Sequence, residues 1–173
     1  MKIAAASPDR FQAVREFYHT VIDGVGDSRD SVRWKKDIYP SPDFLKSSLC
    51  SGELFTATDD ETMIGAMILN HLCNDEYKTF PWPTKAKDSE ITVIHALAVH
   101  PFFTGKGYGR QMVQYAIDYA REHQQKAIRL DVLKGNLRAE KLYSGMGFRL
   151  LHTLPMFYED TGWTDFQLYE YRV

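Results

Sequence analysis

The sequence lacks several features that mark specialised classes of protein. Only two cysteines, Cys50 and Cys73, occur among 173 residues, and they form no CxxC pair, so reduced thiols are expected rather than a disulfide or a zinc site. No run of about eighteen apolar residues and no apolar leader is present, which argues against a membrane partner and for a cytosolic protein. Low-complexity tracts and solenoid repeats are missing too.

The charge of the chain excludes few classes of function. The formal net charge is -2 at pH 7, which does not favour nucleic-acid binding. Basic residues outnumber acidic ones in 101–149, and acidic residues outnumber basic ones in 40–90. A basic segment suits a phosphate-bearing ligand and an acidic one suits a cationic acceptor, although an ordinary solvated surface gives the same pattern. With 44% hydrophobic and 25% charged residues, the chain has the composition of one globular domain over 1–173.

Hydrophobic periodicity predicts alternating strands and helices in the order β-α-α-β-β-β-α-β-α-β-β, and therefore a mixed sheet covered by helices. The strands are expected at 3–5, 53–58, 62–69, 91–99, 127–133, 149–157 and 163–172. Helices are expected from Ser7, as N-cap, to Gly24, at 42–49, and at 137–146 before Gly147. A strong helix is also expected after the glycines 105, 107 and 109, with its apolar positions, from Tyr108 to Ala120, on one face. Residues 25–41 are expected to form a loop or short helix, and 71–90 a long surface loop.

The most informative stretch is the glycine turn of residues 104–109, Thr-Gly-Lys-Gly-Tyr-Gly, between a strand and a helix. Glycines let the backbone approach a ligand, and a helix N-terminus presents free N–H groups, so the turn suits a pyrophosphate. A P-loop would need Ser or Thr at Gly107, and a dinucleotide fingerprint would need glycine at Arg110. Taken alone, the triplet is equally typical of a tight strand-to-helix connection.

The segment from Ala96 through Gly109 resembles motif A of the GNAT superfamily of N-acetyltransferases, in which an Arg/Gln-x-x-Gly-x-Gly/Ala turn cradles the pyrophosphate of CoA. Gly107 and Gly109 match, and Thr104 replaces the usual Arg or Gln. We expect that replacement to be tolerated, because backbone N–H groups do most of the cradling. The resemblance implies contacts to acetyl-CoA from Leu97, Ala98, Val99, Thr104, Gly105, Lys106, Gly107, Tyr108, Gly109, Arg110 and Asn136.

A second segment, 136–148, resembles motif B of the same family, Asn-x-x-Ala-x-x-Leu-Tyr-x-x-x-Gly-Phe, at every marked position. The resemblance is strong over 91–157 and holds elsewhere in element order. It implies an α+β fold of the GNAT type, with a mostly antiparallel sheet of six to seven strands flanked by helices. Asn136 is expected to cap the following helix and, by resemblance, to contact the pantetheine arm.

By resemblance, Tyr143 is the acid that protonates the leaving thiolate; packing on an amphipathic helix is the alternative. A base must also deprotonate the amine. Strict alternation places Ile91, Val93, His95 and Leu97 on one strand face, which makes His95 a candidate. A hydrogen-bonded strand histidine, a substrate-facing histidine and a water relay are the alternatives. The resemblance also implies that the backbone N–H of Val99 or Leu97, with a bulge at Ala98, polarises the acetyl carbonyl.

The acceptor cleft is expected to draw on aromatic residues, although core or surface packing is the better explanation for any single one of them. The candidates are Trp34, Tyr39, Trp82 and Tyr158, with Phe157 and Trp163 beside them. The resemblance implies acetyl transfer from acetyl-CoA to a primary amine of a small molecule, by direct attack in a ternary complex. A protein or peptide N-acetyltransferase and a non-catalytic acyl-CoA-binding module are the alternatives. No metal is expected, and a homodimer is compatible with the resemblance.

Overall fold

The computed structural model describes residues 1–25 and 33–173, which are organised by a seven-stranded sheet in the order β1-β2-β3-β4-β5-β7-β6. The strands are β1 Lys2–Ala5, β2 Leu54–Asp59, β3 Thr62–Asn70, β4 Ile91–Val99, β5 Ala127–Leu133, β6 Arg149–Tyr158 and β7 Gly162–Arg172. The helices are α1 Phe11–Val25, α2 Pro42–Cys50, α3 Asp75–Thr79, α4 Tyr108–Glu122 and α5 Leu137–Ser144. Only the β4–β5 pair is parallel, so the predicted mixed, mostly antiparallel sheet is confirmed.

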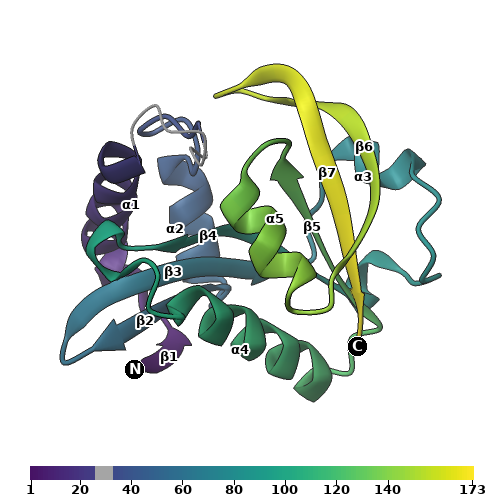
Figure 1. Ribbon diagram of the computed structural model, residues 1–173. Coiled ribbons are helices and arrows are strands. Elements are labelled where there is room, and N and C mark those ends of the chain that lie inside the picture. Colours follow the sequence, from purple (N-terminus) through teal and green to yellow (C-terminus); the bar gives the residue numbers. More distant parts are fainter. Residues whose placement is uncertain (26–32) are drawn as a thin grey trace.

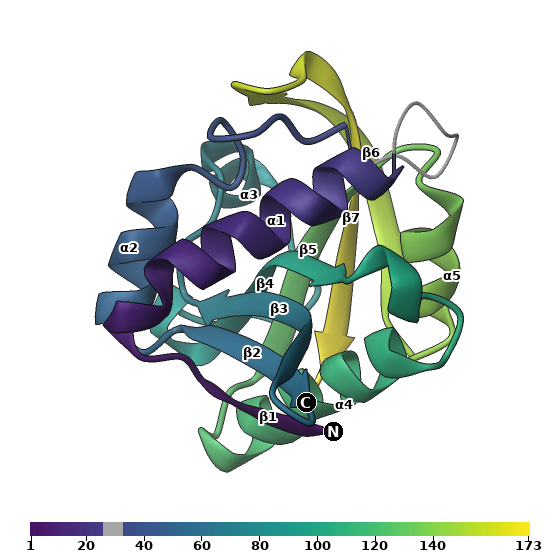
Figure 2. The ribbon, with the colours of Figure 1, turned by 90° about the vertical axis from the view of Figure 1, so that its left-hand side faces the viewer.

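Helices cover both faces of the sheet, and strand alternation decides which side chains meet them. In β3, Ala66 and Ile68 pack with α1 and α2, whereas Met67 and Leu69 pack with α4. Figure 2 shows α1 lying across β3, and Figure 1 shows α4 and α5 on the other side. The predicted apolar face of α4 is buried as expected, through Met112, Val113, Ala116, Ile117 and Ala120. None of the helices in the described ranges is both long and apolar enough for a bilayer crossing.

The parallel pairing of β4 and β5 ends after three residue pairs. Ile91, Thr92 and Val93 pair with Ala127, Ile128 and Arg129. Beyond them, β4 pairs with β3 and β5 pairs with β7. Figure 1 shows that β5, β6 and β7 then run in a different direction from β3 and β4. The sheet therefore opens between its two central strands.

A β-bulge at Ala96 interrupts β4 just beyond the last of these pairs. Ala96 has a φ of 49°, and the register with β3 shifts between Ala66 and Ile68. His95 and Ala96 consequently both lie on the side of α1 and α2, while Leu97 packs on the opposite side. Strict alternation, which placed His95 and Leu97 on one face, is therefore wrong here, as is the bulge expected at Ala98.

Three further expectations need correction. Residues 71–90 do not form a plain surface loop, because α3 lies within them and Tyr77 and Trp82 are buried. Ser7 makes no capping bond to the backbone; its hydroxyl donates to Asp9, and α1 begins at Phe11 after a short 3-10 turn. Helix α5 ends at Ser144, two residues before the expected end. The expectation for 25–41 lies partly outside the described residues; within 33–41 the chain forms turns.

Candidate functional site

Two connected cavities occupy the opening between β4 and β5. The first, here called the aromatic pocket, is lined by Trp34, Tyr39, His95, Asp131, Tyr158, Asp160 and Phe166, among others. The second, here called the glycine-turn pocket, has a volume of about 250 Å³ and lies between the end of β4 and the N-terminal parts of α4 and α5. Trp34, Leu97, Asn136, Ala139 and Tyr143 line both cavities. A ligand in one cavity therefore reaches the other beside Tyr143.

The glycine-turn pocket contains the residues that the sequence predicted for a pyrophosphate, except Lys106, whose Nζ lies 5.1 Å from the centroid of the Phe103 ring. Gly105 and Gly107 have φ of 78° and 83°, and a Cβ at either position would meet no atom within 4 Å. Helix α4 starts immediately afterwards, and its first intrahelical bond runs from the N–H of Gln111 to the carbonyl of Gly107 at 3.2 Å. The three amides before Gln111 are thus donors at an open helix N-terminus.

Local contacts hold the other residues of this pocket. Asn136 Oδ1 accepts a hydrogen bond from the N–H of Ala139 at 3.2 Å, so the predicted N-cap of α5 is confirmed. The hydroxyl of Thr104 donates to the carbonyl of Pro101 at 2.9 Å. A Cβ on Gly109 would lie 3.4 Å from Leu142 Cδ2, so this glycine lets α4 and α5 pack closely.

Tyr143 projects from α5 to the boundary between the two pockets. The residue is 7% exposed, and its hydroxyl has no hydrogen-bond partner within 1–25 and 33–173. Burial, followed by the negative charge of Asp131, raises the pKa of the Tyr143 phenol above its ordinary value. Tyr143 therefore remains protonated, and its hydroxyl is available to a ligand that extends from one pocket into the other.

Asp131 is a carboxylate that the sequence interpretation missed. It lies on β5 and lines the aromatic pocket, where its Oδ1 accepts hydrogen bonds from the hydroxyls of Tyr77 at 2.7 Å and Tyr158 at 3.0 Å. Burial raises its pKa, and the two phenol hydrogen bonds partly oppose that rise. The sequence did contain a signal for Asp131, because it is a single carboxylate near the otherwise apolar end of a buried strand.

His95 also lines the aromatic pocket, but hydrogen bonds fix its ring. Its Nε2 lies 3.0 Å from Asn70 Oδ1 and 3.0 Å from the carbonyl oxygen of Leu72. Asn70 Oδ1 also accepts from the N–H of Leu72 at 3.0 Å, so both neighbours of Nε2 are acceptors and Nε2 carries the proton. Burial lowers the pKa of His95 to about 4. These contacts favour the hydrogen-bonded strand histidine over the base.

Three of the six aromatic residues predicted for the acceptor cleft, Trp34, Tyr39 and Tyr158, meet in the aromatic pocket. The ring centroids of Trp34 and Tyr39 are 5.5 Å apart, and those of Tyr39 and Tyr158 are 6.0 Å apart. Phe166, which the sequence did not indicate, extends this wall from Tyr158 at 4.9 Å. The pair Phe157 and Trp163 is exposed instead, at 51% and 68%.

Trp82 is not part of the pocket, so that prediction is wrong. Its indole Nε1 donates to the carbonyl of Tyr77 at 2.8 Å, and the guanidinium of Arg129 lies 4.2 Å from its ring centroid. Arg129 is in turn paired with Glu170 at 3.0 Å. Trp82 therefore packs α3 against β5 and β7. This agrees with the alternative given from the sequence, in which Trp82 is a packing residue.

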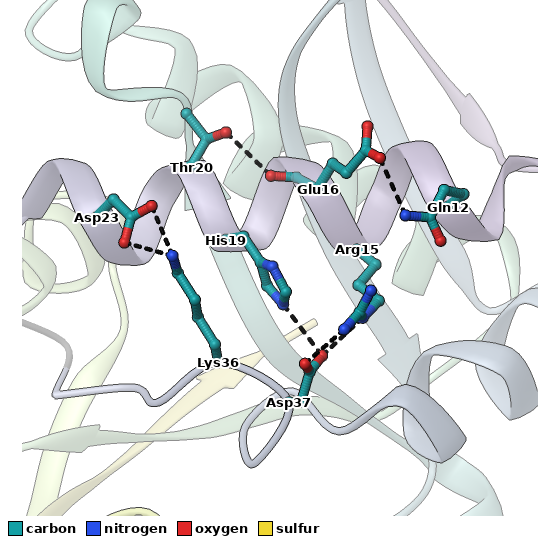
Figure 3. Close-up of polar contacts among 8 residues, drawn as sticks. All are labelled: Gln12, Arg15, Glu16, His19, Thr20, Asp23, Lys36 and Asp37. Atoms are coloured by element: carbon teal, nitrogen blue, oxygen red, sulfur yellow. Dashed lines mark hydrogen bonds and ion pairs between the residues drawn. The ribbon is translucent and has the colours of Figure 1, made fainter.

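An ionic clamp fixes the segment 33–40, which carries Trp34 and Tyr39, to helix α1 (Figure 3). Asp37 accepts hydrogen bonds from Arg15 Nε at 2.7 Å and Nη2 at 2.6 Å, and it lies 3.0 Å from His19 Nε2. Lys36 pairs with Asp23 at 2.7 Å one turn further along. The two aromatic rings thus depend on α1 for their position.

We predict that Asp37→Asn makes unfolding less dependent on pH in acid. The Arg15 hydrogen bond lowers the pKa of Asp37 from 3.8 to about 2. The stabilisation is therefore complete above the ordinary pKa and is lost as the pH falls through the folded one. Urea unfolding curves should give a lower free energy of unfolding for Asp37→Asn than for wild type at neutral pH. This difference should disappear as the pH approaches 2.

Asp60→Asn is the matched control for this experiment. Asp60 is also exposed, has a positive φ of 42°, and forms no ion pair with the described residues. Its substitution should leave the pH dependence of wild type unchanged. If the free energy of unfolding of Asp37→Asn stays below that of wild type by the same amount down to the lowest pH, the ionic clamp does not stabilise the fold as proposed.

The chain is similar to known proteins in both sequence and fold. A model of the acetyltransferase (GNAT) family matches residues 21–148. An uncharacterised N-acetyltransferase of Archaeoglobus fulgidus is 32% identical over 68 residues, which cover 39% of this chain and 46% of that protein. The curated relatives are matched over less than half of their own length.

Solved structures match over almost the whole chain. A GNAT-family acetyltransferase from Streptococcus agalactiae has a TM-score of 0.80 at 16% identity, covering 99% of this chain and 95% of that one. A structure from Salmonella typhimurium, described as an acetyltransferase with its cofactor acetyl-CoA, has a TM-score of 0.68 at 17% identity and covers 99% and 93%. At such low identities these structures establish the shared fold.

Proposed function

Because the chain belongs to the acetyltransferase (GNAT) family, we propose that it transfers an acetyl group from acetyl-CoA to a primary amine of a small molecule. The observation that carries the proposal is the position of Tyr143, whose unpaired hydroxyl lies where the glycine-turn pocket meets the aromatic pocket. One cavity accepts the CoA moiety and the other accepts the amine, so the transferred group lies beside this hydroxyl.

The residues of the glycine-turn pocket fit CoA. Space is open above Gly105 and Gly107, and the amides of Tyr108, Gly109 and Arg110 can bind a pyrophosphate. Within the described residues, the edge of β4 that faces the opening has no strand partner beyond Val93, so its polar backbone groups can bind the amide-bearing pantetheine arm. When bound there, acetyl-CoA would supply an activated thioester.

Backbone donors lie at the position where negative charge develops on the acetyl oxygen. The N–H of His100 donates to Ile64 of β3 at 2.9 Å. Since N–H groups alternate in direction along a strand, those of Leu97 and Val99 point away from β3 and into the opening. We assign one of them to polarising the acetyl carbonyl, in agreement with the donors named from the sequence.

Asp131 is a better candidate for the base than His95. The amine must lose a proton to attack, and a carboxylate with a raised pKa accepts a proton more readily than an ordinary one. Both phenol hydrogen bonds fall on Oδ1, which leaves Oδ2 for the amine or an intervening water. In this assignment Asp131 takes one proton from the ammonium group, the neutral nitrogen attacks the acetyl carbon, and Tyr143 protonates the sulfur as the C–S bond breaks. The second proton that the nitrogen loses as the amide forms returns to Tyr143, so the products are the amide and the free CoA thiol, with one net proton on Asp131.

The small size of the aromatic pocket supports a small-molecule acceptor over a folded protein. Its walls come from segment 33–40, the turn between β6 and β7, and β5, so the acceptor enters between side chains rather than along an open groove. A peptide N-acetyltransferase and a non-catalytic acyl-CoA-binding module remain the competing functions, and both are distinguished by the experiments that follow.

We predict that Gly107→Ala weakens acetyl-CoA binding about tenfold or more, because its Cβ enters the space over the turn and the positive φ becomes strained. Isothermal titration calorimetry measures this binding. Gly52→Ala is the matched control, since Gly52 has a φ of 69° with open space around it and lies after α2, outside both pockets. Equal affinities in the two variants would remove the glycine turn from the CoA site.

We predict that Tyr143→Phe lowers kcat about 100-fold or more and leaves the dissociation constant of acetyl-CoA within a few-fold of wild type, because it removes only the proton donor. Thiol release from acetyl-CoA should be followed with a panel of polyamines, amino acids, aminoglycosides, arylalkylamines and lysine peptides. Release only with lysine peptides would favour the peptide acetyltransferase. Acetyl-CoA binding without release for any amine would favour the binding module.

We predict that Asp131→Asn abolishes the acid limb of the pH–rate profile and lowers kcat about 100-fold or more. The isosteric amide can still accept hydrogen bonds from Tyr77 and Tyr158. His95→Gln, which keeps a donor toward Asn70 and Leu72, should retain the limb, because a pKa of about 4 places the titration of His95 below the working range. The opposite result, with the limb lost only in His95→Gln, would restore His95 as the base.

A further inference from the structure

Asp160 is a buried carboxylate that has no ion-pair partner in the described parts of the chain. It lies in the turn between β6 and β7, is 5% exposed, and lines the aromatic pocket together with Asp131. None of the nine ion pairs found in the described residues includes it. Backbone hydrogen bonds from Asp160 and Thr161 and the charge of Lys35 lower its pKa, but no described residue forms an ion pair with it, so a ligand that brings a cation would offset the cost of burying this charge.

The surroundings of Asp160 favour a cation as well. Trp34, Tyr39 and Tyr158 line the same cavity, and their linked rings offer faces that attract ammonium groups. Of the described residues that line the cavity, none is lysine or arginine. An acceptor that carries a carboxylate, such as an α-amino acid, therefore meets two aspartates and no lysine or arginine in the lining of the cavity.

The two carboxylates can serve two different nitrogen atoms. The reacting nitrogen must be neutral when it attacks, and Asp131, beside Tyr143, is the group that would take its proton. Asp160 contacts neither of the two phenol hydroxyls that bind Asp131. It can therefore hold a second nitrogen that keeps its charge while the first one reacts.

We propose that the acceptor is a small aliphatic diamine or polyamine, whose second ammonium group binds between Asp160 and the rings of Trp34, Tyr39 and Tyr158. This proposal rests on the proposed acetyl transfer for the identity of the reacting amine, but not for the cation site itself. Lys35 and Glu159 are the charged residues that act on the carboxylate of Asp160. The charge of Lys35 lowers the pKa of Asp160 and that of Glu159 raises it, while burial is the largest influence and raises it.

The test compares straight-chain diamines with monoamines of the same carbon number at mildly alkaline pH. Thiol release from acetyl-CoA measures turnover, and calorimetry without acetyl-CoA measures binding of the amine. For wild type we expect kcat/KM to be roughly 30-fold higher for the preferred diamine than for its monoamine, with the difference mainly in KM. Asp160→Asn should bring this ratio close to one. Glu159→Gln is the matched control, because Glu159 is the exposed carboxylate next in the turn, and it should keep the preference.

The outcomes separate the cation site from the acetyl transfer. Equal use of diamines and monoamines by wild type, or a preference that survives in Asp160→Asn, overturns the cation site and leaves acetyl transfer standing. Diamine binding that is lost in Asp160→Asn, without thiol release for any amine, supports the cation site and overturns acetyl transfer. Diamines that neither bind nor react, while lysine peptides react, overturn the proposed acceptor class.

Discussion

The early end of the pairing between β4 and β5 is the constraint on which the rest of the structure depends. Three residue pairs hold the two strands together, and beyond Val93 and Arg129 they diverge. A sheet that stayed closed would bury the faces of both strands and leave no room between them. Because it opens, the polar backbone edge of β4 and the carboxylate of Asp131 face one another across a cavity instead of a hydrogen-bond ladder. Helix α5 then places Tyr143 at the boundary between the two halves of that cavity.

The sequence predicted most of the architecture, because the elements around the opening follow simple periodic patterns. Strands β4 and β5 were predicted with the bounds that are observed, and the helix predicted after the glycine turn is α4. Strand β4 is a mostly apolar run, β5 has Ile128, Leu130 and Val132 on one side, and α4 has a complete amphipathic stripe after its glycine turn. The ends of α5 and α1 were less predictable, since fraying and capping depend on local hydrogen bonds such as that between Ser7 and Asp9.

The candidate site was harder to predict than the fold, for reasons visible in particular residues. The bulge falls at Ala96, which has no sequence signal for a left-handed conformation, so alternation misplaced His95 relative to Leu97. Trp82 stands in a proline-rich stretch that resembles a loop, and only its contacts with Tyr77 and Arg129 reveal that it is core. Asp160 lies in an ordinary turn sequence, and its burial follows from the way in which segment 33–40 packs against the turn between β6 and β7.

Backbone strain shows which element positions the aromatic pocket. Ala96 and Asp37 have φ of 49° and 61°, conformations that cost about 1–3 kcal/mol each for residues other than glycine and persist only where the surroundings enforce them. Helix α1 enforces both: the buried hydroxyl of Tyr18 donates to the carbonyl of Ala96 at 2.9 Å, while Arg15 and His19 hold Asp37. These three side chains follow one another at helical spacing on α1. Helix α1, in the part of the chain that contains neither family motif, therefore helps to shape the aromatic pocket, whereas the motif-bearing part supplies the glycine turn and Tyr143. This division explains why the motifs that identify the family do not identify the amine.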